Sequence, residues 1–354
     1  MKGSLLTQLV GSYSKPRWLI RHHRVTTPYG DETFWRPEPE VLEDAQDDAT
    51  RLAIADQERA GLDVITDGEE RRHRFDSYFL RFRGLDTTRL GQWSMDDRDM
   101  SFIQLDPALK GRLGQAYAPR VVDKLGWPGP AALEDLRFLK RHASRPVKMT
   151  VIGPLTAAAR LVNEFYADEE ALGMDLASVI NRELRALDEE GADVLQLDEP
   201  DFHFRADQAC RWGTRALDVA LEGIRCTTAV HICYGYALIG KKQVNPRYTQ
   251  ALEAIAGSRA QQISLEYEQP GHEPDLLRHC GDKEVILGLL NLGSRQVETP
   301  EHIARRLRDA LEVVPAERLR VAPDCGMWFL PRDVAYAKLE ALVAGTAMVR
   351  ESLP

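Results

Sequence analysis

The chain has 354 residues and a formal net charge of −9, and 44% of its residues are hydrophobic. This length allows one large hydrophobic core, and the ordinary proportions of charged and aromatic residues exclude a disordered chain. The acidic balance, with both signs interspersed, argues against a nucleic-acid-binding protein, which needs a basic face. No run of about 18 apolar residues occurs, so the sequence predicts no membrane-spanning helix.

The N-terminus and the cysteines predict a cytoplasmic protein. The first apolar stretch is broken by Gln8 and Gly11, and it is too short and too polar for a secretory signal. The five cysteines are few, odd in number and scattered. That usage is typical of a reducing compartment and predicts no disulfide framework.

Short apolar runs alternate with segments of helical periodicity along the whole chain. Eight runs have the length and composition of buried strands, at residues 7–12, 63–68, 147–153, 193–199, 228–234, 262–267, 284–290 and 319–325. A strand followed by a helix, repeated eight times, is typical of the α/β class and of one closed parallel sheet. We therefore expect a single (β/α)8 barrel, the TIM barrel.

Three of the intervening segments carry clear helix signals. Residues 170–190 place apolar side chains three and four positions apart, which predicts one apolar stripe. Thr299 and Pro300 are typical of an N-cap and a first helical residue, and they predict a helix over 300–313. Residues 331–350 open with Pro331, and we expect that proline to start a helix in the same way.

The chain is longer than the roughly 250 residues of a typical barrel, so we expect two insertions. Residues 13–38, after the first strand, are rich in arginine, histidine, proline and aromatic side chains. Residues 84–146, after the second strand, contain a Gly-Trp-Pro-Gly-Pro stretch. No linker or repeat is visible, so we expect one catalytic domain over 1–354; the alternative is a barrel with a small excursion built from 84–146.

The tails of the predicted strands carry chemistry-bearing residues. Active sites of such barrels lie where the strands end. The tails contain Ser12, Asp67, Glu69, Asp198, Glu199, His231, Cys233, Glu266, Asn291, Asp324 and Cys325. Turn formation alone explains Asp, Gly, Pro and Asn at the ends of strands, but it does not explain His, Cys and Glu there.

Four of these side chains form a candidate metal site. His231 and Cys233 are two apart on one strand and so point to the same face, and Glu266 and Cys325 follow other strands. Thiols with an imidazole favour zinc over magnesium or calcium, and long irregular spacing is typical of catalytic sites. Alternatively, the His-x-Cys pair packs in the core and Glu266 partners a helix N-terminus.

Seven stretches resemble the cobalamin-independent methionine synthase family. In chain order they are LVGSYSKP (9–16), ITDGEERR (65–72), VIGPLT (151–156), DVLQLDEP (193–200), VHICYG (230–235), ISLEY (263–267) and VAPDCGMWFLPRD (321–333). The similarity runs over essentially the whole chain, but it covers only the catalytic C-terminal barrel of the long bacterial and plant enzymes. The chain therefore looks like the short, stand-alone form of archaea and some bacteria.

The resemblance implies a Zn²⁺ cofactor bound by His231, Cys233, Glu266 and Cys325. It implies that zinc binds the substrate thiol as a thiolate, which then attacks an electrophilic methyl carbon. Glu266 is the hardest of the four ligands, and we expect it to loosen when the substrate sulfur arrives.

The resemblance also implies binding residues for an amino-acid substrate. Ser12 matches a residue that holds the substrate carboxylate, and Glu69 and Asp198 match the acids that receive its α-ammonium group. A zwitterion needs donors at one end and carboxylates at the other. The alternative for the two acids is an ion pair with a neighbour such as Arg71 or Arg72.

The residues expected near the methyl donor differ from those of the long enzymes. Where those enzymes carry a tryptophan that stacks on folate, this chain has Ala158, Ala159 and Arg160. Where they carry a histidine implicated in protonating the leaving folate, this chain has Gly293. The donor is therefore left open between methyl-folate, a corrinoid and another carrier, and Arg160 is either an anion-binding residue or a surface arginine.

Together these features predict a zinc-dependent methyltransferase that moves a methyl group to a thiol, with homocysteine as acceptor and methionine as product. One alternative is zinc-dependent alkyl transfer to another small thiol of the coenzyme M type. The other is a non-catalytic zinc-binding partner subunit. No nucleic-acid or membrane partner is expected.

Overall fold

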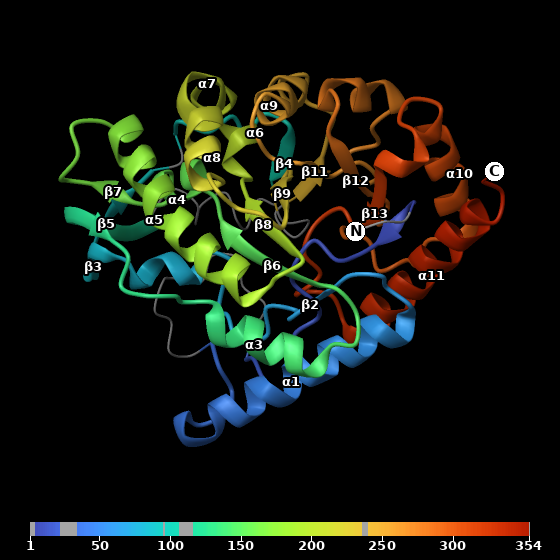
Figure 1. Cartoon of the computed structure of the whole chain (residues 1–354), viewed down its shortest axis with the longest axis horizontal. Helices are drawn as coiled ribbons and strands as arrows, with labels where there is room; N and C mark the ends of the chain where they lie inside the picture. Colours follow the sequence, from blue (N-terminus) through green and yellow to red (C-terminus); the bar gives the residue numbers. More distant parts are fainter. Residues whose placement is uncertain (1–3, 22–33, 95, 106–115, 236–239, 354) are drawn as a thin grey trace.

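The computed structural model describes residues 4–21, 34–94, 96–105, 116–235 and 240–353. Its central sheet has eight strands (Figure 1): β1 (Leu6–Thr7), β2 (Ile65–Thr66), β6 (Val147–Ile152), β8 (Val194–Asp198), β9 (Thr227–Ile232), β11 (Gln262–Leu265), β12 (Glu284–Gly288) and β13 (Leu319–Ala322). Each strand overlaps one of the eight predicted runs.

The order of the strands closes the sheet into a barrel. It is β1-β13-β12-β11-β9-β8-β6-β2, and neighbouring strands pair in parallel. Parallel bridges from Gln8 to Val64 and from Ser12 to Gly68 join the two outer strands of that order. The predicted (β/α)8 fold is confirmed. Because every strand runs the same way, residues from distant parts of the chain meet at one rim.

Helices surround the barrel in Figure 1. The longer ones are α1 (Pro39–Ala60), α3 (Leu133–His142), α5 (Glu169–Glu190), α9 (Arg247–Ala256), α10 (Pro300–Leu311) and α11 (Arg332–Arg350). Shorter helical segments are α4 (Pro154–Ala158), α6 (Asp201–Phe204), α7 (Ala206–Gln208), α8 (Thr214–Ala220), the 3₁₀ turns η1 (Ser77–Arg81), η4 (Pro274–Cys280) and η5 (Ala316–Arg318), and the π turn η2 (Ala209–Gly213). Among the described helices, none combines the length and apolar content needed to cross a bilayer.

The three predicted helices are present, and of the two predicted helix starts one is confirmed. The Asp168 side chain accepts the backbone N–H of Ala171 at 2.8 Å and caps α5. The Thr299 hydroxyl accepts the N–H of His302 at 3.2 Å and caps α10. The placement of Pro331 as a first helical residue is wrong by one position, because its extended ψ of 140° puts it just before α11.

Residues 84–146 contribute two accessory sheets and one helix, α3. In one sheet β3 (Arg83–Trp93) pairs with one edge of β5 (Ala116–Gly126), and β7 (Val162–Asn163) pairs with the other edge of β5. In the second, β4 (Ile103–Leu105) pairs antiparallel with β10 (Gly240–Lys242). The segment therefore reaches the loop that follows β9 on the barrel.

The 13–38 segment folds back toward α1 where it is described; residues 22–33 of the prediction lie outside the described part. Ile20 and Trp35 form an antiparallel bridge. Leu19, Ile20 and Phe34 are buried in a small apolar cluster with Ala49 of α1. This packing places the segment beside the first strand tail.

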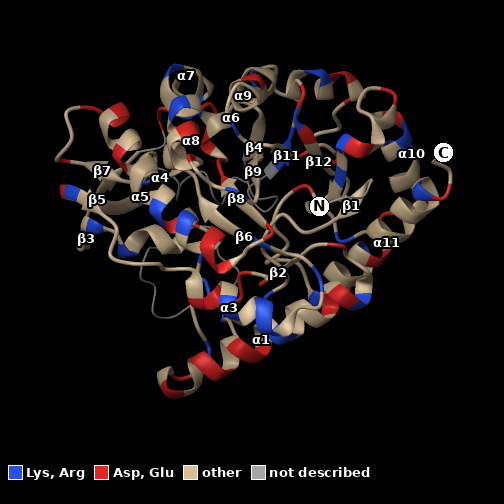
Figure 2. Ribbon diagram, viewed as in Figure 1, with Lys and Arg blue, Asp and Glu red and all other residues tan. Residues whose placement is uncertain are grey.

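The barrel interior is filled by both apolar and polar side chains. A small buried cluster takes its members from six of the strands or their ends, namely Val10, Val64, Val194, Ala229, Ile286 and Ala322. Lys148 and Gln196 are also buried inside, on β6 and β8. Lys, Arg, Asp and Glu are interspersed over the outer helices (Figure 2).

Candidate functional site

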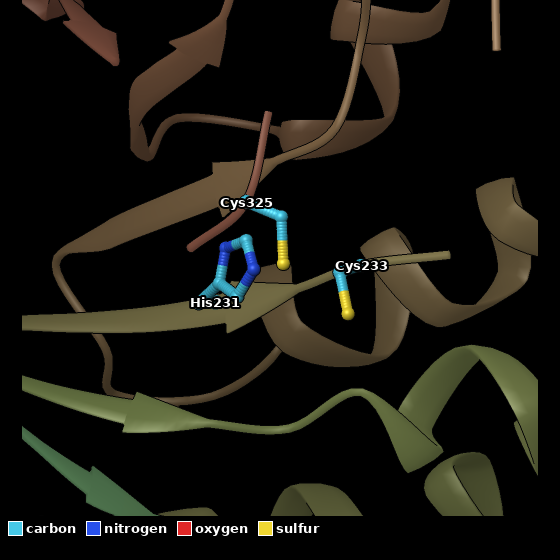
Figure 3. A group of neighbouring side chains, drawn as sticks. All are labelled: His231, Cys233 and Cys325. Carbon is cyan, nitrogen blue, oxygen red and sulfur yellow. The ribbon is translucent and has the colours of Figure 1, made fainter. Parts of the chain in front are cut away.

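Three potential metal ligands converge at the carboxyl end of the barrel. His231 lies on β9, Cys233 follows it, and Cys325 follows β13, which is separated from β9 by two strands. Their ligand atoms lie within 4.8 Å of one another, and all three residues are buried (Figure 3). The closed sheet thus brings together side chains that are about ninety residues apart in the sequence.

The His231 ring is oriented as a metal ligand. Its Nδ1 lies 2.9 Å from the hydroxyl of Ser264, the residue paired with it across β9 and β11. Its Nε2 is buried and has no hydrogen-bond partner within the described ranges. Burial, with the charges of Lys148 and Lys242, lowers the pKa of His231 to about 3. A neutral ring with one nitrogen held and the other free is the arrangement that metal-binding histidines adopt.

The two thiols suit a site that holds a cation. The Cys233 sulfur accepts the backbone N–H of Gly235 at 3.3 Å, which fixes its position at the end of β9. A hydrogen bond with Cys233 and burial raise the pKa of Cys325 well above its usual value. Two buried thiols so close together do not both ionise without a positive charge between them, and a metal ion supplies that charge.

Glu266 reaches this centre but contacts a lysine. It follows β11 and is fully buried. Its Oε1 and Oε2 accept hydrogen bonds from Lys242 Nζ at 2.8 and 2.6 Å. The group of mutually close ligand atoms, as far as the described residues go, contains His231, Cys233 and Cys325 without it.

Asp324 fixes the loop that carries Glu266. Its carboxylate accepts the backbone N–H groups of Tyr267, Glu268 and Gln269 at 3.0, 2.9 and 2.6 Å. Burial and the charge of Glu266 raise the pKa of Asp324 to about 7. The residue before Cys325 therefore links the turn after β13 to the turn after β11, so two parts of the centre are held in one geometry.

Ser12 lies against the Cys325 turn. A Cβ added to Gly326 would come within 2.2 Å of the Ser12 hydroxyl oxygen, so the Ser12 side chain occupies the space that a larger residue at 326 would need. The Ser12 carbonyl also accepts the N–H of Met327 at 3.0 Å. A hydroxyl from the first strand is thus placed next to the candidate metal ligands.

Glu69 sits in a left-handed turn after β2, with a φ of 57°. That conformation is costly for a side chain other than glycine and is common at functional sites. Its carboxylate accepts the Thr150 hydroxyl at 2.9 Å and lies 3.9 Å from Arg72. Arg71 does not reach it and pairs with Asp47 instead.

Asp198 ends β8 directly beside His231 in the sheet register. Its Oδ1 accepts a hydrogen bond from Gln196 Nε2 at 2.7 Å. The side-chain oxygen of Gln196, Oε1, in turn accepts a hydrogen bond from Lys148 Nζ at 3.0 Å. Burial and the charge of Glu69 raise the pKa of Asp198 to about 7, and burial lowers that of Lys148 to about 7. The sequence left open an ion pair between Asp198 and a neighbour such as Arg71 or Arg72. Within the described ranges no arginine or lysine is ion-paired with Asp198, and Arg72 pairs with Asp67 and Glu69 instead.

The two residues that depart from the long enzymes have local explanations. Arg160 Nε lies 3.5 Å from Asp76 and its Nη2 lies 3.6 Å from Asp201, so two buried carboxylates engage it. Gly293 is exposed, and a Cβ there would come within 2.5 Å of the Gln269 side chain. Arg160 is therefore neither a free surface arginine nor a free anion-binding group.

Fold and site together define a class of protein. It is a parallel barrel enzyme that brings one imidazole and two thiols together at its rim as candidate ligands for a soft metal ion. A hydroxyl and two carboxylates that suit a zwitterion lie beside that group.

Comparison with known proteins identifies the family. The family model "Cobalamin-independent synthase, Catalytic domain" matches residues 5–347. A methionine synthase of Saccharolobus solfataricus is 32% identical over 99% of this chain and 96% of its own length. One of Sulfurisphaera tokodaii is 31% identical over 99% and 94%. The chain belongs to the cobalamin-independent methionine synthase family, and it is a methyltransferase.

Solved structures agree with the fold. The B12-independent methionine synthase of Shewanella sp. W3-18-1, solved with selenomethionine, is 32% identical, has a TM-score of 0.87 and is covered over 99% of both chains. A putative vitamin-B12-independent methionine synthase from Listeria monocytogenes shares the fold, with a TM-score of 0.72 at 19% identity.

Three residues at the site were not singled out from the sequence. Lys148 and Gln196 did leave a signal, because a polar residue in the middle of a buried strand needs a partner inside the barrel. Lys242 left none, since its position depends on the pairing of β10 with β4.

Proposed function

We propose that this enzyme methylates the thiol of homocysteine to give methionine, with Zn²⁺ held by His231, Cys233 and Cys325, and with Glu266 as the fourth protein ligand. The observation that carries the proposal is the approach of three buried ligand atoms to within 4.8 Å of one another, one of them an unpartnered imidazole nitrogen. The names of the relatives from S. solfataricus and S. tokodaii support the same acceptor.

Bound Zn²⁺ would lower the pKa of the incoming thiol and so supply a nucleophilic sulfur at neutral pH. His231 contributes a neutral ring whose Nδ1 is already engaged by Ser264. Two thiolates and a carboxylate make the ligand set electron-rich, and such a set keeps a bound sulfur nucleophilic. The softness of these ligands is the reason for proposing zinc over a hard cation.

The amino-acid end of the substrate is assigned to Ser12, Glu69 and Asp198. The Ser12 hydroxyl donates to the substrate carboxylate, and the two acids accept from its ammonium group. The support is electrostatic, because Asp198 and Glu69 are buried carboxylates whose mutual repulsion a cationic ligand would relieve. The selenomethionine in the Shewanella relative is an amino acid of this size and charge.

The methyl donor is proposed to be methyl-folate, a corrinoid or another methyl carrier, and these three are the arms of one assay. Arg160 and Gly293 occupy the positions at which folate-specific side chains were expected. Since Arg160 is engaged by Asp76 and Asp201, we assign it no donor-binding role. We further propose that residues 1–354 act as one catalytic unit, because β4 and β10 tie the 84–146 segment to the barrel.

The decisive experiment measures methyl transfer to homocysteine, and to a mercaptan of the same length without the amino group, by the zinc-loaded enzyme. The proposal expects turnover of homocysteine with at least one donor and poor turnover of the other thiol. Preference for the amino-free thiol would point to coenzyme M-type alkyl transfer. Chelation should abolish activity and leave the circular dichroism spectrum intact, whereas unfolding on chelation would show a structural zinc.

A further inference from the structure

A fully buried ion pair lies at the edge of the candidate metal centre. Lys242 Nζ donates to both oxygens of Glu266, at 2.8 and 2.6 Å, and neither side chain is exposed to solvent. Removing one partner of such a pair leaves an uncompensated buried charge, which is strongly destabilising. The pair therefore fixes where the Glu266 carboxylate rests.

The backbone around Lys242 is anchored by the 84–146 segment. Lys242 pairs with Ile103 in the β4–β10 ladder, and Gln243 donates its N–H to the Phe102 carbonyl at 2.9 Å. The neighbouring Lys241 is exposed, as expected for the opposite face of a strand. A lysine side chain is long and flexible, but here its base is fixed by a second part of the chain.

The charges around Lys242 are those of the metal ligands. The negatively charged groups that act on Lys242 include Glu266, Cys325 and Cys233, all of them candidate ligands. Two thiolates and one carboxylate carry three negative charges, whereas a divalent cation supplies two positive ones. The Lys242 ammonium supplies the third, so the buried centre is neutral only when it is included.

We propose that Lys242 is a positioning residue that binds the Glu266 carboxylate whenever the metal ion does not. This inference rests on the proposed function. With a zinc ion held by His231, Cys233 and Cys325, Glu266 would serve as the exchangeable fourth ligand. Its carboxylate would give way to the substrate sulfur, and the thiol proton would pass to solvent. The released carboxylate remains buried. The free-energy cost of burying its charge is small because Lys242 is already within hydrogen-bond distance.

The test uses the full chain loaded with Co²⁺, whose absorption spectrum reports sulfur and oxygen ligands, and titrates it with homocysteine. In Lys242→Met the carboxylate has no second partner and stays on the metal, so we expect thiol affinity to fall by about tenfold or more. Lys242→Arg should recover most of it. Lys241→Met, one residue away on the same strand, is the matched control and should bind like the wild type.

A double variant separates positioning from general stability. Lys242→Met with Glu266→Gln removes the buried charge and the competing carboxylate together, so thiol affinity should return to within about threefold of the wild type. Wild-type affinity in Lys242→Met would overturn the inference, as would a double variant no better than the single one. A wild-type spectrum that does not respond to homocysteine would overturn the proposed function as well.

Discussion

The two halves of the site differ in how their charges are compensated. On the metal half, the Glu266 carboxylate already has a partner in Lys242. On the amino-acid half, Asp198 is hydrogen-bonded to a neutral Gln196, and Glu69 lies 3.9 Å from its nearest arginine contact. Lys242 contacts both oxygens of Glu266, whereas Arg72 reaches Glu69 only at 3.9 Å and the charge of Asp198 is offset from a distance by Arg72 and Lys148. A positive group from the substrate would complete the compensation of the second half.

This difference separates what each half selects. A metal ion enters a site whose ligands can be deprotonated in exchange, so the metal half discriminates by softness of its donors. The amino-acid half discriminates by charge, because an amino-free thiol would leave the repulsion between Glu69 and Asp198 to be offset by Arg72 and Lys148 alone. Substitutions on the metal half should therefore alter metal content, and substitutions on the amino-acid half should alter the preference among thiol substrates.

The largest effect is expected from Cys325→Ser. Loss of one thiolate removes a ligand that a hydroxyl replaces poorly, so zinc content should fall from about one ion per chain to near zero, with transfer falling in parallel. Metal analysis after dialysis and a methyl-transfer assay measure the two quantities. Cys210→Ser, at an exposed cysteine, is the control and should keep both. Full zinc content in Cys325→Ser would show that Cys325 is not a zinc ligand.

Asp198→Asn tests the other half without touching the metal ligands. A charge-assisted hydrogen bond contributes about 1.5–3 kcal/mol, so kcat/KM for homocysteine should fall by about 10- to 100-fold. Zinc content should not change. Steady-state kinetics with homocysteine and with the amino-free thiol give the comparison. An equal loss for both thiols would show that Asp198 does not recognise the ammonium group.

Gly326→Ala tests the contact between the two halves. The new methyl group would meet the Ser12 hydroxyl, and because that hydroxyl can rotate, the expected result is a lost hydrogen bond to substrate. Such a bond contributes about 0.5–1.5 kcal/mol, or about 2- to 12-fold in homocysteine affinity. Ser12→Ala should have the same effect, and the double variant no more. Gly257→Ala, with φ of −71° and ordinary contacts, is the control.

The smallest effect is the contribution of one histidine, His272, to the pH dependence of stability in the metal-free protein. Burial lowers the pKa of His272 to about 4 and those of His203 and His231 to about 3. The unfolded chain binds these protons first as pH falls below 6.5, so each histidine contributes a decrease in the free energy of unfolding toward acid of up to about 1.4 kcal/mol per pH unit. The buried carboxyls of Asp198 and Asp324, whose pKa values are raised to about 7, contribute in the opposite direction. Urea unfolding between pH 6.5 and 4.5 measures the slope, and His272→Gln should reduce it by one proton. An unchanged slope would mean that His272 titrates alike in both states.

Much of the fold followed from the sequence because parallel strands and their tails are local patterns. Each of the eight apolar runs overlaps a barrel strand, and closure of the sheet brings His231, Cys233 and Cys325 together. Thr299 capped its helix as expected because N-capping depends on a few adjacent residues. Pro331 missed by one position, because proline is equally compatible with the extended residue before a helix.

The remaining features depend on contacts between distant segments. Lys242 becomes part of the site only through a ladder with β4, which no local pattern in either segment indicates. Arg160 was left open between two roles, since the carboxylates of Asp76 and Asp201 that engage it lie elsewhere in the chain. Helix α3 lies within the range predicted as an insertion and packs against β6, so part of that range belongs to the barrel.

X-ray absorption at the zinc edge, recorded with and without homocysteine, reports whether a sulfur atom replaces an oxygen atom at the metal. We expect a first shell of two sulfur atoms, one imidazole nitrogen and one oxygen, which changes to three sulfur atoms and one nitrogen when the thiol is added. A shell with the same atoms before and after addition would contradict this expectation.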